Sequence, residues 1–165
     1  MKILGIDGST TTIGWAINDD KVIKDCGFID ISKKKINKDK SLSLISVIKP
    51  ITDLHHINLE SPLFGFGFGK SSQQTIVKLV KFNAILEYIL SEELNLPINL
   101  INVNTARKSV LGKAWIKGIS PKEYVKYELP KLIPYIHKFD VINKKGNVDK
   151  RMEDVYDAII CSLFG

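Results

Sequence analysis

Four acidic residues stand at positions where a folded chain could use them for chemistry. Asp7 and Glu60 each end a short apolar segment, and Asp154 and Asp157 lie three residues apart near the end of the sequence. An acid at a strand end lies at the rim of an α/β sheet, where ligands bind, and two acids three residues apart share one face of a helix. Each acid taken alone could equally be a turn residue or a solvated surface residue. Together, four carboxylates supply the oxygen ligands that a hard divalent cation requires.

The elements that would hold these acids follow from the apolar periodicity and the turn residues. Strands are predicted over residues 2–7, 12–18, 21–31, 56–60 and 98–103, with a hairpin turn at 18–20. Helices are predicted over 41–54, 73–94, 105–111 and 149–163, and from Pro121 onward behind a Ser120 cap, with loops at 33–40 and 61–69. A meander followed by β-α units indicates a mixed sheet with helices on its faces, in one α/β domain over residues 1–165. Asp154 and Asp157 fall away from the apolar stripe of the last helix, so we expect both outside the core.

The composition is that of an ordinary globular protein. Of 165 residues, 44% are hydrophobic and 25% charged, which excludes a wholly disordered chain. The two cysteines are far apart, so neither a zinc ribbon nor a disulfide scaffold is expected. No segment approaches the ~18 apolar residues of a membrane span, and Asp7 interrupts the first apolar segment too early for a signal peptide. We therefore expect no membrane partner and a cytoplasmic location, in the host cytoplasm if a phage encodes the protein.

The positive charge is concentrated in one part of the sequence. The net charge is +6, yet residues 101–151 alone carry 12 basic and four acidic residues, a net charge of +8. A smaller lysine cluster lies at 33–40. These are either two solvated surfaces or a surface that binds a phosphate backbone. In the second case Lys108 and Lys113 would contact phosphates near the acids, and Lys117 and Lys122 would extend that surface.

Three segments resemble, in order and spacing, the acidic motifs of the RuvC-type Holliday-junction resolvases, which are ribonuclease H-like nucleases. They are residues 3–9 (Ile-Leu-Gly-Ile-Asp-Gly-Ser), 58–60 (Asn-Leu-Glu) and 154–158 (Asp-Val-Tyr-Asp-Ala), and residues 104–112 resemble the basic segment of that family. Gly8-Ser9 replaces the proline-glycine of many members, and the short chain resembles the phage branch. The resemblance implies a ribonuclease H-like five-stranded sheet, with a three-stranded antiparallel meander, two parallel strands and helices on both faces.

The resemblance also implies a chemistry for the four acids. They would hold two Mg²⁺ ions, for which Mn²⁺ could substitute, and would hydrolyse phosphodiesters of four-way junctions and other branched DNA. Asp7 would bridge both ions, Glu60 and Asp154 would help to hold one or both, and Asp157 would complete the second site. Glu153 competes with Asp154 for that role. Arg107, in the basic segment, joins the four lysines as a DNA-binding candidate, and no nucleotide cofactor is implied.

Two further features bear on how such a nuclease would bind its substrate. Phe64, Phe66 and Phe68 alternate with glycines just after Glu60. They either pack beneath the loop or stack on unpaired bases at the centre of a junction. The predicted helix 73–94 is apolar on more than one side, so it could also pair with a second copy in a C2 homodimer. We expect Val77, Ile89 or Leu90 to face outward there.

Three other functions stay open at this point. An RNA–DNA hybrid ribonuclease or a flap endonuclease would use the same acids. A non-catalytic nucleic-acid-binding module would keep the fold alone, but such a module gains nothing from clustered carboxylates. Residues 7–11 also resemble the first phosphate loop of actin-like sugar kinases and chaperone ATPases. Those proteins need two such domains and a second glycine-rich motif, for which 165 residues leave no room.

Overall fold

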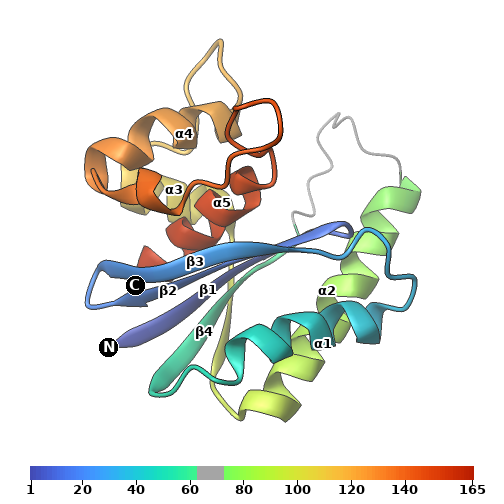
Figure 1. Ribbon diagram of the computed structural model, residues 1–165. Coiled ribbons are helices and arrows are strands. Elements are labelled where there is room, and N and C mark those ends of the chain that lie inside the picture. Colours follow the sequence, from blue (N-terminus) through green and yellow to red (C-terminus); the bar gives the residue numbers. More distant parts are fainter. Residues whose placement is uncertain (63–72) are drawn as a thin grey trace.

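A computed structural model of the protein describes residues 1–62 and 73–165 and contains one five-stranded mixed sheet (Figure 1). The strand order is β3-β2-β1-β4-β5. The strands are β1 (Lys2–Gly8), β2 (Thr12–Asp19), β3 (Val22–Asp30), β4 (Leu54–Glu60) and β5 (Ile98–Ile101). β1, β2 and β3 pair antiparallel as a meander, whereas β4 and β5 run parallel to β1. This arrangement confirms the predicted sheet. The predicted Phe64, Phe66 and Phe68 contacts lie outside the described residues.

Helices cover both faces of the sheet, as predicted (Figure 1). One face packs against α1 (Asn37–Ile48) and α2 (Gln73–Leu94), and its core includes Leu4, Ile6, Leu44 and Phe82. The other face packs against α5 (Met152–Leu163), with α3 (Val103–Leu111), α4 (Pro121–Leu132) and the short 3-10 helix η1 (Ile136–Phe139) outside it. Because both faces are covered, the central strands β1 and β2 are buried along most of their length.

The backbone of α5 lies directly against the backbone of β1 and β2. A Cβ atom on Gly5 would lie 2.0 Å from the carbonyl oxygen of Ala158, and one on Gly14 would lie 2.3 Å from that of Asp154. Both distances are shorter than any van der Waals contact, so only glycine fits at these two positions. The close approach brings the acidic N-terminal half of α5 next to the end of β1.

Buried amides hold the C-terminal end of α5 on the sheet. The Asn18 side chain donates a hydrogen bond to the Ser162 carbonyl (2.7 Å), and the Asn58 side chain donates to the carbonyls of Cys161 (2.8 Å) and Phe164 (2.9 Å). The last carbonyls of a helix have no partner within the helix itself. The two asparagines therefore supply hydrogen bonds to carbonyls at the end of α5 and fix that end on the sheet.

Some boundaries differ from the predicted ones. α1 begins at Asn37, inside the predicted loop 33–40, and ends before Pro50. β5 ends at Ile101, because the Asn102 side chain accepts hydrogen bonds from the backbone of Asn104 and Thr105 and so caps α3. On α2, Val77 is exposed as predicted, but Ile89 and Leu90 are buried in the core, so that part of the prediction is wrong.

Across the helices that the structure describes, none combines the length and the apolar character that a membrane span requires.

The α5 contact predicts the effect of enlarging Gly14. Gly14→Ala should destabilise the fold by at least about 1–3 kcal/mol, because the added methyl group can be accommodated only if α5 moves away from β2. Urea unfolding measures this loss. Gly27→Ala is the matched control on β3, since its Cβ would first meet a side chain, that of Trp15, at 3.3 Å. Equal stability of the two variants would show that α5 does not depend on this contact.

Candidate active site

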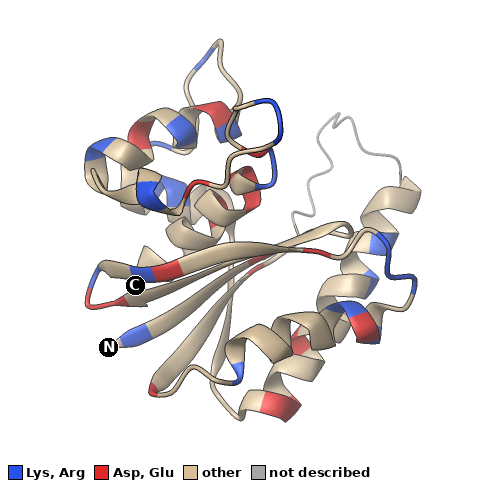
Figure 2. Ribbon diagram, viewed as in Figure 1, with Lys and Arg blue, Asp and Glu red and all other residues tan. Residues whose placement is uncertain are grey.

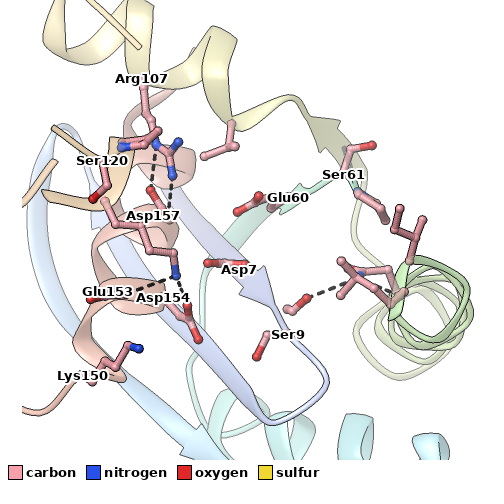
Figure 3. Close-up of a pocket in the computed structure, with 18 residues that line it drawn as sticks. Asp7, Ser9, Glu60, Ser61, Arg107, Ser120, Lys150, Glu153, Asp154 and Asp157 are labelled. Atoms are coloured by element: carbon pink, nitrogen blue, oxygen red, sulfur yellow. Dashed lines mark hydrogen bonds and ion pairs between the residues drawn. The ribbon is translucent and has the colours of Figure 1, made fainter. Parts of the chain in front are cut away.

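A cavity of about 750 Å³ opens at the carboxyl ends of β1 and β4 (Figure 3). Strands β1 and β4 and helices α2, α3, α4 and α5 all contribute to its walls. The acidic residues that line it are Asp7, Glu60, Glu153, Asp154 and Asp157. The four predicted acids and the competing Glu153 thus share one cavity, although they come from three distant parts of the sequence.

Three of these acids form a tight cluster. Ile6 pairs with Leu59 across the parallel strands β1 and β4. The next residues, Asp7 and Glu60, therefore lie side by side at the carboxyl ends of these strands. Asp157 reaches the same point from α5, and one carboxylate oxygen from each of the three lies within 4.8 Å of the others. Figure 3 shows the three side chains directed into the same space.

The cluster is electrostatically costly without a cation. Burial, together with the charges of Glu60, Asp157 and Asp154, raises the pKa of Asp7 well above its ordinary value. Burial and the charge of Asp157 raise the pKa of Glu60 from 4.5 to about 7, although a hydrogen bond with Asp7 opposes the shift. Burial also raises the pKa of Asp157, against the opposing effect of Arg107. The cluster therefore retains protons at a pH where free carboxylates have lost them.

Arg107 neutralises Asp157 from inside the protein. Its Nε donates to Asp157 Oδ1 at 3.0 Å and its Nη2 to Oδ2 at 2.7 Å, and the two side chains are 7% and 3% exposed. One expectation is corrected here. Asp157 is buried rather than outside the core, because a bidentate partner satisfies its carboxylate. Arg107, whose contact with DNA stays a prediction, is itself buried, lies in the cavity wall and is directed at Asp157.

Lys122 holds Asp154 in a similar way at the rim of the cavity. Its Nζ lies 2.7 Å from Asp154 Oδ1 and 3.7 Å from Glu153 Oε2. Partial burial alone would lower the pKa of Lys122, but the Asp154 carboxylate raises it above its ordinary value. Asp154 is outside the cluster of three, but its charge contributes to the raised pKa of Asp7.

The cluster fits a divalent cation that prefers oxygen ligands. Three carboxylates converge, and Glu60 Oε2 is buried with no hydrogen-bond partner within residues 1–62 and 73–165. A buried acceptor of this kind is unfavourable unless a cation or donor meets it. Asp7, Glu60 and Asp157 could bind the ion directly, and Asp154 could join them if Lys122 released it.

The remaining basic candidates lie on the surface of α3 and the loop that follows it. Lys108, at the end of α3, and Lys113 and Lys117, in the following loop, are exposed. Figure 2 shows Lys and Arg gathered over α3, α4 and the segment before α5. Two residues of the cavity wall were missed by sequence reasoning, Lys150 and Asn83. Asn83 donates to the Gly8 carbonyl at 3.2 Å; a polar residue between the apolar Phe82 and Leu86 was the available signal.

Comparison with known proteins gives matches in structure only, since no family profile and no curated protein sequence matches this chain. RuvC of Thermus thermophilus, solved in complex with a Holliday junction substrate, matches with a TM-score of 0.66 and 14% identity over 99% of this chain and 92% of that one. The fowlpox virus resolvase, solved with substrate Holliday junction DNA, gives 0.54 and 16% over 99% and 95%. The yeast mitochondrial Holliday junction resolvase Ydc2 gives 0.60 and 17% over 98% and 76%.

The chain has the fold of the RuvC-type resolvases. The predicted resemblance to these ribonuclease H-like proteins is therefore confirmed for the fold. In this chain the RuvC fold brings Asp7, Glu60 and Asp157 together at the carboxyl edge of its parallel strands.

The raised pKa of Glu60 predicts how stability changes with pH. Between pH 4.5 and about 7 the folded protein binds more protons at Glu60 than the unfolded chain does, so the metal-free protein loses stability as the pH rises. Glu60→Gln removes this contribution. From pH 5 to pH 8 in the presence of a chelator, the variant should gain about 1–3 kcal/mol relative to the wild type, measured by chemical unfolding. Glu92→Gln, on the exposed surface of α2, should follow the wild type. If Glu60→Gln shows the same pH dependence as the wild type, the pKa of Glu60 is not raised in the folded protein.

Removal of Arg107 tests the buried ion pair. Arg107→Ala should destabilise the protein by about 3–5 kcal/mol, because it leaves Asp157 buried without a partner. Lys131→Ala breaks an exposed pair with Glu128 of the same 2.7 Å length and should cost less than about 1 kcal/mol. Thermal or urea unfolding of both variants gives the comparison. Similar losses would mean that the Arg107 contact contributes no more than a surface ion pair.

Proposed function

We propose that this protein is a divalent-metal-dependent endodeoxyribonuclease that cuts four-way DNA junctions. The observation that carries the proposal is the cluster of Asp7, Glu60 and Asp157, with carboxylate oxygens within 4.8 Å of one another. Support comes from the fold, since matching proteins of the same architecture were solved with Holliday junction DNA. The excess of positive charge in residues 101–151 suits a polyanionic substrate.

Phosphodiester cleavage requires an activated water and a stabilised leaving oxygen. Mg²⁺, as two bound ions, supplies both functions when it occupies such a site, and Mn²⁺ can take its place. Asp7, on which the charges of Glu60, Asp157 and Asp154 all act, would help to hold both ions, and Glu60 and Asp157 would each help to hold one. These carboxylates must lose their protons to bind metal, so metal affinity should increase with pH.

Lys122 connects the acidic site with DNA binding. Its ammonium group neutralises Asp154 at 2.7 Å and lies in the wall of the cavity. If Asp154 served as a metal ligand, Lys122 would be free to contact a phosphate oxygen of the substrate. Three further lysines are exposed on α3 and in the loop that follows it: Lys108, Lys113 and Lys117. They would bind phosphates of the substrate at a distance from the cleaved bond.

A homodimer would match the symmetry of the substrate, because a four-way junction presents two equivalent strands for cutting. Helix α2 leaves an apolar strip exposed, formed by Val77, Ile85 and Tyr88. A groove beside it, lined by Tyr88, Leu96, Pro97 and Ile98 among others, continues this surface toward β5. We infer that a second copy covers this strip.

Asp7→Asn should abolish cleavage and leave junction binding intact or tighter, because the variant loses a metal ligand and a negative charge that faces phosphates. Parallel assays with a four-way junction, a flap, an RNA–DNA hybrid and a plain duplex measure both properties in Mg²⁺. Asp39→Asn, in the first turn of α1, is the control and should cut normally. Near-normal cleavage by Asp7→Asn would refute the metal site. If the wild type cuts the hybrid or the flap in preference to the junction, that nucleic acid is its substrate and the junction is not.

The inferred dimer predicts the effect of a charge on α2. Tyr88→Glu should give a folded monomer that still binds Mg²⁺ but no longer makes paired cuts in a junction, because burying the added carboxylate between two copies is unfavourable. Sedimentation velocity and junction cleavage measure the two effects. Tyr127→Glu changes an equally prominent tyrosine on α4 and should remain dimeric. A wild type that sediments as a monomer both free and bound to a junction would contradict the dimer.

A further inference from the structure

An exposed tryptophan stands in the loop between α3 and α4. Trp115 is 60% exposed, whereas the only other tryptophan of the sequence, Trp15, is buried in the sheet at 8%. Its neighbour Ile116 is exposed as well. In Figure 1 the loop projects beyond α3 and α4, away from the sheet. Tryptophan gains much from burial and is enriched at interfaces, so Trp115 with its exposed neighbour is a candidate contact for a partner.

The surroundings of Trp115 favour nucleic acid over protein as this partner. Lys113 and Lys117 flank it two residues away on either side, and both are exposed. Lysine is depleted at protein–protein interfaces. An aromatic ring between cations is instead typical of surfaces that bind a strand by stacking on a base and pairing with its phosphates.

The loop leads directly into the wall of the cavity. Gly112 and Gly118, with φ of 81° and 97°, turn the chain at its two ends, so that Trp115 lies near its middle. The chain then runs directly into Ser120, Pro121 and Lys122, which line the cavity. Six residues separate Trp115 from Lys122, so their Cα atoms are at most about 25 Å apart. At about 3.4 Å per nucleotide of one strand, that span corresponds to roughly seven nucleotides from Lys122, which contacts Asp154 in the wall of the cavity.

We propose that Trp115 is a DNA-binding residue that stacks on a nucleobase whose face is exposed at the branch point of the substrate. This inference rests on the proposed function and adds to it a means of recognising branched DNA. An intact duplex hides the faces of its bases in the stack, so it offers Trp115 only sugars and phosphates. A branch point interrupts the stack and exposes at least one base face.

Tryptophan fluorescence tests this stacking directly, with Asp7→Asn as the background so that DNA is bound and not cut. A four-way junction with hairpin-closed arms should quench the emission strongly, because the excited indole loses its excitation by reversible electron transfer to a base stacked on it. A hairpin-closed duplex of equal length should quench far less. In the Trp115→Phe variant the remaining emission comes from the buried Trp15 and should be unchanged by either DNA.

Binding measurements on the same background separate stacking from charge. Trp115→Ala should weaken junction binding roughly 5- to 100-fold without altering its salt dependence, and Trp115→Phe should stay within about threefold of the parent. Lys117→Ala should instead reduce the slope of log K against log salt by about 0.9. Tyr127→Ala, which removes an exposed ring on α4, should have no effect.

The outcomes distinguish this inference from the function on which it rests. Equal quenching by junction and duplex, or unchanged junction binding by Trp115→Ala, would overturn the role of Trp115 while wild-type cleavage of junctions left the proposed function standing. A wild type that neither binds nor cuts junctions would overturn both.

Discussion

Contact between the backbone of α5 and the backbones of β1 and β2 determines where the acidic side chains meet. Gly5 and Gly14 permit this contact, because a Cβ atom at either position would lie within 2.3 Å of an α5 carbonyl oxygen. With α5 this close, Asp157 reaches the carboxyl edge of β1 and β4, where Asp7 and Glu60 end side by side. Asn18 and Asn58 hold the other end of the helix. A longer distance between helix and sheet would separate the carboxylates, and the cavity would no longer hold three converging carboxylate groups.

Bringing like charges together is unfavourable, and the protein offsets this cost without removing it. Arg107 neutralises Asp157 inside the core, and Lys122 neutralises Asp154 at the rim. Asp7 and Glu60 have no comparable cation of their own within the described residues, and their pKa values are raised. The unmet negative charge is therefore localised at the ends of the two strands. A divalent cation should therefore bind at this cluster in preference to the other acidic residues of the surface.

Much of the fold could be predicted from local patterns, since the strands, the helix 73–94 and the cap at Ser120 depend on nearby residues. The acids could be grouped because strand ends and helical spacing limit where they point. The Arg107–Asp157 pair could not be predicted, because its partners are 50 residues apart and only the packing of α3 on α5 joins them. The helical wheel placed Asp157 outside the core on the assumption that only apolar residues are buried. Ile89 and Leu90 were misplaced for a different reason: the prediction let α2 bury only one stripe against the sheet, whereas α1 also packs on α2 and widens its buried face.

The central claim is that Asp7, Glu60 and Asp157 together bind divalent metal. Crystals soaked in Mn²⁺ and measured at the manganese absorption edge test it most directly. We predict an anomalous peak in contact with carboxylate oxygens of all three residues. At saturating Mn²⁺, a cavity with no such peak, in which Arg107 still holds Asp157 and the carboxyl groups of Asp7 and Glu60 share protons, would contradict the account.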